Sequence, residues 1–325
     1  MKRLRLLVCF VFITIISSVS FGADADHPKL QDIQKWVDQG TFTKVNGAKV
    51  FVVSAGKAKQ KGHGVLIVHG FPGSSWDWSG VVPQIAEHTR VVIPDMIGFG
   101  RSDKPQKGTF EDHYSLFKQA DLYEAIAKKE GLTEVMLVAH DMGQTVASEL
   151  MKRHQEGTLS FKIKHAIIFD GSTLINLVNL LPMQINALAA PDTLGPDIPR
   201  DAIMKDLNDS FAYTYPAGER VLGIMADQIL HNEGDRVFNR QIRYMIQRKE
   251  NLQRWQAGII NFNGPVSMFW AEDDPVSVVK MAYAWKDMQP KIDLHIWPGV
   301  AHWPMIDVPD RVAKVILDRY STTEY

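Results

Sequence analysis

The stretch Val135–Gln144 constrains the fold most, because it reads as a strand, a tight turn and a helix in immediate succession. Residues 135–139 are all apolar or small, which predicts a short buried strand. A helical pattern follows over Gln144–His154. Asp141 stands between the two elements, and a small residue lies two positions before it and two after it. Such spacing predicts a turn so sharp that a branched neighbour would clash.

In a turn of this kind, called a nucleophile elbow, the central side chain projects from the end of a sheet, and Ser is its usual occupant. Here the position holds Asp141. A carboxylate is already anionic, so it can attack a saturated carbon and leave an ester on the protein. The alternative is that Asp141 only caps the following helix, because Asp is a favoured N-cap residue. The stretch by itself leaves both open.

Residues 1–25 have the pattern of a signal peptide. A basic start is followed by the apolar run Leu6–Ile16, and Ala23-Asp-Ala25 fits a cleavage site. The run is short for a membrane span. We expect export to the periplasm or medium and no stable membrane insertion after cleavage; an uncleaved anchor is the alternative. The one cysteine, Cys9, lies in this leader, so the mature chain excludes disulfides, zinc–thiolate clusters and a cysteine nucleophile.

The composition excludes some classes of partner and leaves others open. The net charge is −1 and no block of like charge occurs, so nothing points to nucleic acid or an anionic membrane surface. Eight tryptophans suit an apolar ligand pocket or, equally, a large core. The sequence says nothing about the oligomeric state.

Strands and helices alternate along most of the mature chain, which predicts an α/β fold with a mostly parallel sheet covered on both faces. A hairpin is expected over residues 41–53, turning at Asn46-Gly47. The further expected strands are 64–68, 90–95, 164–170, 265–270 and 294–297, and the helices outside the elbow are 115–129 and 309–320.

Residues 172–261 interrupt this alternation with helical patterns, expected over Ala202–Phe211, Gly218–Asn232 and Asp235–Trp255. A segment of this length exceeds a simple connection. We therefore divide the chain into a signal peptide (1–25), a core (26–171 and 262–325) and a helical cap (172–261). A cap over the carboxyl ends of the strands would exclude water from Asp141.

Three further motifs follow expected strands. His69-Gly-Phe71-Pro is placed to supply an oxyanion hole, with the backbone N–H groups of Phe71 and Met142 as donors; its alternative is an ordinary Gly-Pro turn. Asp274 and His302 complete the order nucleophile, acid, histidine. His302 would activate water while Asp274 fixes its tautomer. Taken singly, His302 could be a core or solvated histidine and Asp274 a turn residue before proline.

The ordered set of motifs resembles the α/β-hydrolase superfamily, in particular its epoxide hydrolase and haloalkane dehalogenase branch. The motifs are His69-Gly-Phe-Pro, Asp95-Met-Ile-Gly-Phe-Gly-Arg-Ser, His140-Asp-Met-Gly and Gly299-Val-Ala-His. The stretches that begin at His113, Ile246 and Arg254 are similar to the mesoderm-specific-transcript-like hydrolases. This resemblance implies an α/β-hydrolase fold with an inserted helical cap.

The resemblance also implies roles for individual residues. Asp141 would be the nucleophile, His302 the base and Asp274 the acid. Some relatives take the acid from the strand after the nucleophile, which here would be Asp170, so both carboxylates remain candidates. No cofactor or metal is implied, and a small apolar substrate is expected.

Epoxide hydrolases and haloalkane dehalogenases differ in the residues that stabilise the leaving group. Dehalogenases have Trp after the nucleophile and often Asn after His-Gly, where this chain has Met142 and Phe71. Epoxide hydrolases have Phe after His-Gly, and cap tyrosines donate a hydrogen bond to the opening oxygen. The usual tyrosine after a cap tryptophan is replaced by Gln256.

Several other side chains could serve as that donor. Tyr213 and Tyr215 are the first candidates, and Gln256, His231 and Tyr244 are substitutes. We expect an epoxide hydrolase, with a haloalkane or haloacid dehalogenase as the alternative. A non-catalytic binding protein of the same fold is the alternative of another class. A carboxylesterase is disfavoured, because an ester attacked by Asp would give an anhydride.

Overall fold

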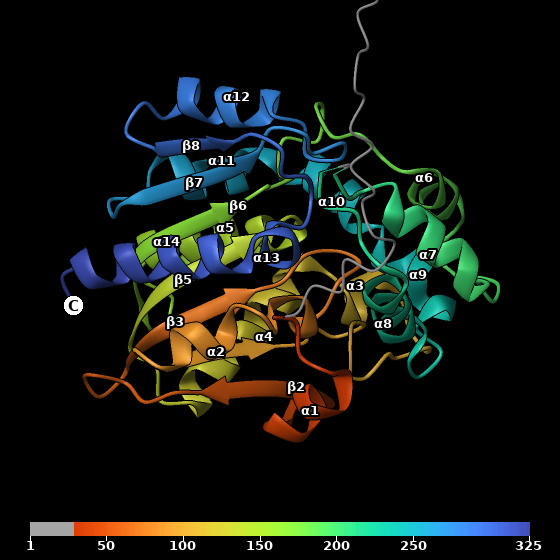
Figure 1. The fold of residues 1–325 in the computed structure, drawn as a ribbon, viewed down its shortest axis with the longest axis horizontal. Helices are drawn as coiled ribbons and strands as arrows, with labels where there is room; N and C mark the ends of the chain where they lie inside the picture. The colour runs from red at the N-terminus through yellow and green to blue at the C-terminus, as the bar shows by residue number, and fades with distance from the viewer. Residues whose placement is uncertain (1–28, 213) are drawn as a thin grey trace, which may run out of the picture.

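The computed structural model describes residues 29–325 apart from residue 213, so the expected signal peptide lies outside the described residues. Its centre is an eight-stranded sheet in the order β1-β2-β4-β3-β5-β6-β7-β8 (Figure 1). From β4 to β8 all neighbours are parallel, as the alternating pattern predicts. The strands are β1 (Gly40–Val45), β2 (Ala48–Ala55), β3 (His63–Val68), β4 (Val91–Pro94), β5 (Glu134–His140), β6 (Lys162–Phe169), β7 (Val266–Ala271) and β8 (Asp293–Trp297).

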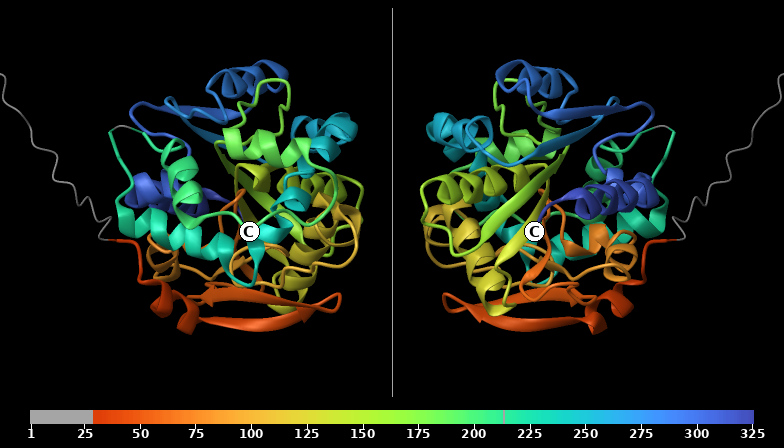
Figure 2. Two further views of the ribbon diagram at one scale, coloured as in Figure 1. Left: turned by 90° about the vertical axis from the view of Figure 1, so that its right-hand side faces the viewer. Right: turned by 90° about the vertical axis from the view of Figure 1, so that its left-hand side faces the viewer.

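The predicted hairpin forms one edge of this sheet. β1 and β2 are antiparallel, with Val45 opposite Ala48 across the turn. Asn46 and Gly47 both have positive φ, 50° and 89°, the conformation that a two-residue hairpin turn requires. Figure 2 shows this hairpin at one edge and β8 at the opposite edge.

Helices cover both faces of the sheet. α2 (Val82–Ala86) and α14 (Pro309–Thr322) pack together on one face, and α4 (Leu116–Lys129) and α5 (Met142–Gln155) on the other. The remaining core helices are α1 (Ile33–Gln39), η1 (Ser75–Trp78), α3 (Phe110–His113), α12 (Lys280–Met288) and α13 (Pro304–Asp307). All eight tryptophans are buried, so most of them serve the core.

The segment between β6 and β7 is helical, as expected, and most of it lies beyond the carboxyl ends of the parallel strands (Figure 1). Its helices are α6 (Pro182–Ala189), α7 (Arg200–Asn208), α8 (Glu219–Leu230), η2 (Gly234–Val237), α9 (Phe238–Gln241), α10 (Tyr244–Glu250) and α11 (Leu252–Ile260). The last of these, α11, packs along α5 of the core. The exact division into core and cap remains a prediction.

The expectation of one continuous helix over Asp235–Trp255 is wrong, because this stretch is broken into η2, α9, α10 and the start of α11. Asn251 leaves the helical region, with φ −114° and ψ 18°, and separates the last two. The Gln247 side chain of α10 accepts the Leu116 N–H at 2.8 Å and donates to Ser115 Oγ at 3.0 Å. These bonds hold the short helix on the core at an angle that a helical pattern cannot reveal.

Across residues 29–325, with residue 213 left aside, no helix has the length and apolar character needed to cross a membrane. Over the same residues no three His, Cys, Asp or Glu side chains converge as metal ligands.

Candidate active site

Asp141 occupies a sharp turn between β5 and α5, with φ 48° and ψ −119°. A non-glycine residue in this region costs about 1–3 kcal/mol and persists only where the surroundings enforce it. Helix α5 begins at Met142, two residues earlier than the pattern predicts. A Cβ on Gly143 would lie 2.5 Å from the Val68 carbonyl oxygen, so only glycine lets the helix approach β3 this closely.

The Asp141 side chain does not cap α5, which removes the alternative interpretation of this residue. Instead it is buried and accepts two hydrogen bonds from other segments. The Phe71 N–H donates to Oδ1 at 2.8 Å and the Ser172 hydroxyl to Oδ2 at 2.7 Å. Burial would raise the pKa of Asp141, but His302 and Arg248 outweigh it and hold that pKa below its ordinary value. The carboxylate is therefore ionised and held in one orientation.

His302 lies in the loop after β8, with its ring between two carboxylates. Its Nδ1 is 2.8 Å from Asp274 Oδ2, and its Nε2 is 4.0 Å from Asp141 Oδ2. The other oxygen of Asp274 accepts the N–H groups of Val276 and Ser277 at 2.7 and 2.8 Å. Burial lowers the pKa of His302, but the Asp274 carboxylate outweighs it and raises that pKa above its ordinary value. His302 is thus fixed with Nε2 facing Asp141.

Asp170, the other candidate acid, bonds elsewhere. Its Oδ1 accepts the Ala271 N–H at 2.7 Å, and its Oδ2 has no partner among the described residues. Burial raises the pKa of Asp170 well above its ordinary value, and the nearby Asp274 charge adds to this. The geometry therefore pairs His302 with Asp274 rather than with Asp170.

The two expected oxyanion donors flank Asp141 from different segments. The Phe71 N–H already points at the carboxylate, and Met142 is the first residue of α5, where N–H groups lack helical acceptors. A Cβ on Gly70 would lie 2.8 Å from Asp141 Cβ, which explains the glycine before Phe71. The loop after β3 can thus place an N–H against an ester carbonyl on Asp141.

Of the first two expected cap donors, Tyr215 lies away from Asp141, and Tyr213 stays a prediction. Tyr213 lies outside the described residues. Tyr215 is half-buried beside Arg311 of α14 rather than at Asp141. The substitutes Gln256 and His231 also face elsewhere: Gln256 contacts Met288, and the His231 ring pairs with Arg101.

Tyr244, at the start of α10, is the cap tyrosine that the fold brings to the site. Its ring packs 5.4 Å from that of Phe71. Burial raises the pKa of Tyr244, and the charge of Asp141 raises it further, so the hydroxyl keeps its proton close to that carboxylate. No sequence signal distinguishes Tyr244, because the helical pattern around it is continuous over Asp235–Trp255. Ser172 carried no sequence signal beyond its place after β6.

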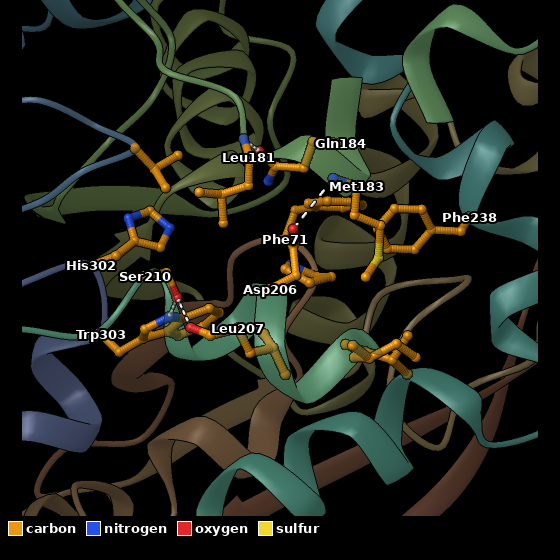
Figure 3. A pocket seen from close by; sticks show the side chains of 14 residues that line it. Phe71, Leu181, Met183, Gln184, Asp206, Leu207, Ser210, Phe238, His302 and Trp303 are labelled. Carbon is orange, nitrogen blue, oxygen red and sulfur yellow. Dashed lines mark hydrogen bonds between the residues drawn. The ribbon is translucent and has the colours of Figure 1, made fainter. Parts of the chain in front are cut away.

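An apolar pocket lies between this cluster and the helices α6, α7 and α9 (Figure 3). It encloses about 390 Å³ of space not filled by atoms, part of it open to solvent. Phe71, His302 and Trp303 form the core side, and Leu181, Met183 and Phe238 are among the residues on the cap side. Asp206 is its acidic lining residue and accepts the Met183 N–H at 3.3 Å. An apolar pocket with few polar groups is typical of small-molecule sites.

A strained turn, a His–Asp pair and an inserted helical segment over one end of a parallel sheet define a hydrolase-type α/β protein. Residues 65–309 match the family model described as the alpha/beta hydrolase fold, and the chain belongs to this family.

Individual relatives agree with that membership. The chain is 29% identical over 289 residues to a Mycobacterium tuberculosis protein named as the hydrolase LipZ, covering 88% of this chain and 96% of that one. It is 28% identical to the mesoderm-specific transcript homolog protein of Bos taurus, covering 85% and 84%. These matches confirm the resemblance drawn from the motifs and support a hydrolase.

Solved structures show the same fold. An alpha/beta hydrolase fold protein from Burkholderia ambifaria aligns with a TM-score of 0.73 at 22% identity, over 87% of this chain and 98% of the other. Similar structures also include esterases and the epoxide hydrolase CorEH, the latter with a TM-score of 0.66 at 20% identity over 87% and 98%. At these identities the likeness concerns the fold alone.

Proposed function

We propose that the protein hydrolyses its substrate through a covalent ester on Asp141, and that the substrate is an epoxide. The observation that carries the proposal is the residue at the turn. An ionised carboxylate sits where the fold exposes a nucleophile, with His302 Nε2 4.0 Å away and the Phe71 N–H on its other oxygen. A carboxylate so placed attacks an electrophilic carbon without first losing a proton.

In the first step Asp141 attacks a ring carbon from the side opposite the carbon–oxygen bond that breaks. The Tyr244 hydroxyl donates its proton to the departing oxygen. Its protonated state and its position over Phe71 suit that task. The product of this step is a hydroxyalkyl ester of Asp141.

In the second step His302 removes a proton from water, which attacks the carbonyl carbon of the ester. The Asp274 carboxylate stabilises the imidazolium that forms. The charge that develops on the carbonyl oxygen is stabilised by the Phe71 and Met142 N–H groups. Collapse of the intermediate releases a diol and regenerates the Asp141 carboxylate, and the proton on His302 restores the Tyr244 hydroxyl that step one deprotonated.

A dehalogenase uses the same two steps with a halide as the leaving group. Phe71 and Met142 offer no side-chain N–H at the positions where the related dehalogenases hold halide. A buried tyrosine hydroxyl beside Asp141 suits a departing oxygen better, because that oxygen must gain a proton and a halide need not.

The test uses the mature protein with His302→Gln, which permits the first step and blocks the second. This variant is incubated with a mixture of epoxides and haloalkanes of distinct masses, and the intact protein mass is recorded. We expect a gain equal to one whole epoxide, abolished by Asp141→Asn. A gain equal to an alkyl group without its halogen would replace the proposal with a dehalogenase. No adduct from a broad mixture would favour the non-catalytic binding protein.

A further inference from the structure

Arg248 of α10 is completely buried, and its side chain hydrogen-bonds with that of Tyr244. Nε donates to Thr145 Oγ1 at 2.9 Å, and Nη1 contacts Met245 Sδ at 3.5 Å. Nη2 bonds to nothing among the described residues. Arginine keeps its proton even when buried, so this is a buried positive charge with a free N–H donor.

Two other arginines of the same segment are paired with carboxylates. Arg254 bonds to Glu149 and Glu156, and Arg240 lies 3.4 Å from Asp192. For Arg248 no carboxylate of the described residues lies within ion-pair distance, although it is the most buried of the three. Leaving a buried charge unpaired is costly, which indicates that an anion from outside the chain completes the site.

The guanidinium lies in the layer of side chains that surrounds Asp141. Thr145, its partner, is one helical turn after Asp141 on α5, and Thr145 Oγ1 is 2.9 Å from Thr173 Oγ1. Thr173 directly follows Ser172, which donates to Asp141. The guanidinium carbon is also 4.5 Å from the centre of the Tyr244 ring. Arg248 thus contacts both Thr145, one helical turn after Asp141, and Tyr244, the expected proton donor.

Asp141 is not the missing partner of Arg248. Its two oxygens already accept the Phe71 N–H and the Ser172 hydroxyl, and it is not within 4.0 Å of the guanidinium. The two charges interact only at longer range. Asp206, the acidic residue of the pocket, has Asp209 and Lys205 as its electrostatic neighbours rather than Arg248. Neither Asp141 nor Asp206 therefore supplies an acceptor for the Nη2 N–H of Arg248.

We propose that Arg248 binds a carboxylate of the substrate, so that the site takes an epoxide with a carboxylate on or next to the ring. This inference rests on the proposed function. A planar guanidinium matches a carboxylate in shape and charge, and the Thr145 and Thr173 hydroxyls can add a donor. A neighbouring carboxylate repels an anionic nucleophile, and the Arg248 charge offsets that repulsion as Asp141 approaches the ring. The carboxylate itself is unchanged while the ring opens and water adds.

The test separates anion binding from turnover in the full mature chain. Binding is measured by calorimetry with cyclopropanecarboxylate, an unreactive analogue of oxirane-2-carboxylate, and with the neutral cyclopropanecarboxamide. Turnover is measured with oxirane-2-carboxylate and oxirane-2-carboxamide. Charge-assisted bonds of this kind predict about a 10- to 100-fold preference for the carboxylate in both measurements. In Arg248→Gln the preference should collapse, and Arg248→Lys should restore part of it.

The matched control is Lys249→Gln, which removes the same charge from the adjacent, exposed position of α10 and should leave the preference intact. Selective binding of the carboxylate without turnover of either epoxide would support the anion site and contradict the proposed function. Equal binding and turnover of both analogues by the wild type would overturn the anion site and keep the function. Bromide binding that depends on Arg248, without carboxylate binding, would also overturn it in favour of a leaving-halide site. If Arg248→Gln does not fold, the wild-type comparison of acid and amide decides.

Discussion

At the scale of single residues, the candidate site is defined by what each Asp141 oxygen contacts. Ser172 contributes a hydroxyl bond at 2.7 Å that favours the charged form of the carboxylate. Because Asp141 attacks only when ionised, activity should fall as the pH drops through its pKa. The hydrogen-bond donors around Asp141 lower that pKa, so they extend the active range to lower pH.

Replacing Ser172 with Ala should therefore raise the Asp141 pKa and move the acid limb of ester formation upward by roughly one pH unit. The measurement is the rate of the first turnover as a function of pH. Ser148→Ala is the matched control, because Ser148 Oγ donates to the Gln144 carbonyl within α5 and does not touch Asp141. An acid limb that stays in place in Ser172→Ala would contradict this role.

At the scale of elements, the break between α10 and α11 decides which side chains reach the site. It places Tyr244 and Arg248 against the core, while α11 is anchored separately on α5. The anchor is Glu149, a buried carboxylate that accepts Arg153 Nε at 2.9 Å, Arg254 Nε at 2.7 Å and Trp255 Nε1 at 3.1 Å.

Glu149→Ala should destabilise the protein by roughly 2–4 kcal/mol, because it removes one of two carboxylate partners from Arg153 and from Arg254 and leaves the Trp255 indole N–H without its acceptor. This expected loss of stability is smaller than the loss for a fully buried ion pair, because both arginines are partly solvated. Urea unfolding followed by tryptophan fluorescence measures the change. Asp318→Ala, which removes an exposed carboxylate paired with Lys314, should cost no more than about 1 kcal/mol. Equal effects of the two changes would rule out Glu149 as the anchor.

At the scale of the whole molecule, the helices between β6 and β7 close over the carboxyl ends of the strands, where Asp141 lies (Figure 1). We propose that residues 172–261 act as a cap that excludes water during the first step, and that residues 1–25 direct the chain out of the cytoplasm. An exported hydrolase without cysteine in its mature form would need no protection against disulfide formation.

Expression of the full chain in a bacterial host should give a soluble exported protein whose mass corresponds to cleavage after Ala25 or close to it. The chain without residues 1–25 should remain in the cytoplasm at its full mass. Cell fractionation and intact mass spectrometry distinguish these results. Full-length protein in the membrane fraction would show that the leader is an uncleaved anchor.

The sequence by itself determined the sheet, the elbow and the order of the site motifs. These depend on local patterns: apolar runs for strands such as β5, glycines where backbones approach, and polar residues directly after strands. The carboxylate partner of His302 could not be read from it, because Asp170 and Asp274 both follow strands. Only the folded structure separates them: His302 Nδ1 lies 2.8 Å from Asp274 Oδ2, whereas Asp170 accepts a hydrogen bond from the Ala271 N–H.

The tertiary structure also decided which cap side chains reach Asp141. Tyr244 and Arg248 lie in a stretch whose helical pattern is continuous in sequence but whose backbone is broken by bonds to the core. Such breaks depend on contacts between residues far apart in the chain, which no local periodicity encodes. The positions of Ser172 against Asp141 and of the unpaired Arg248 N–H are set in the same way, by packing between separate segments.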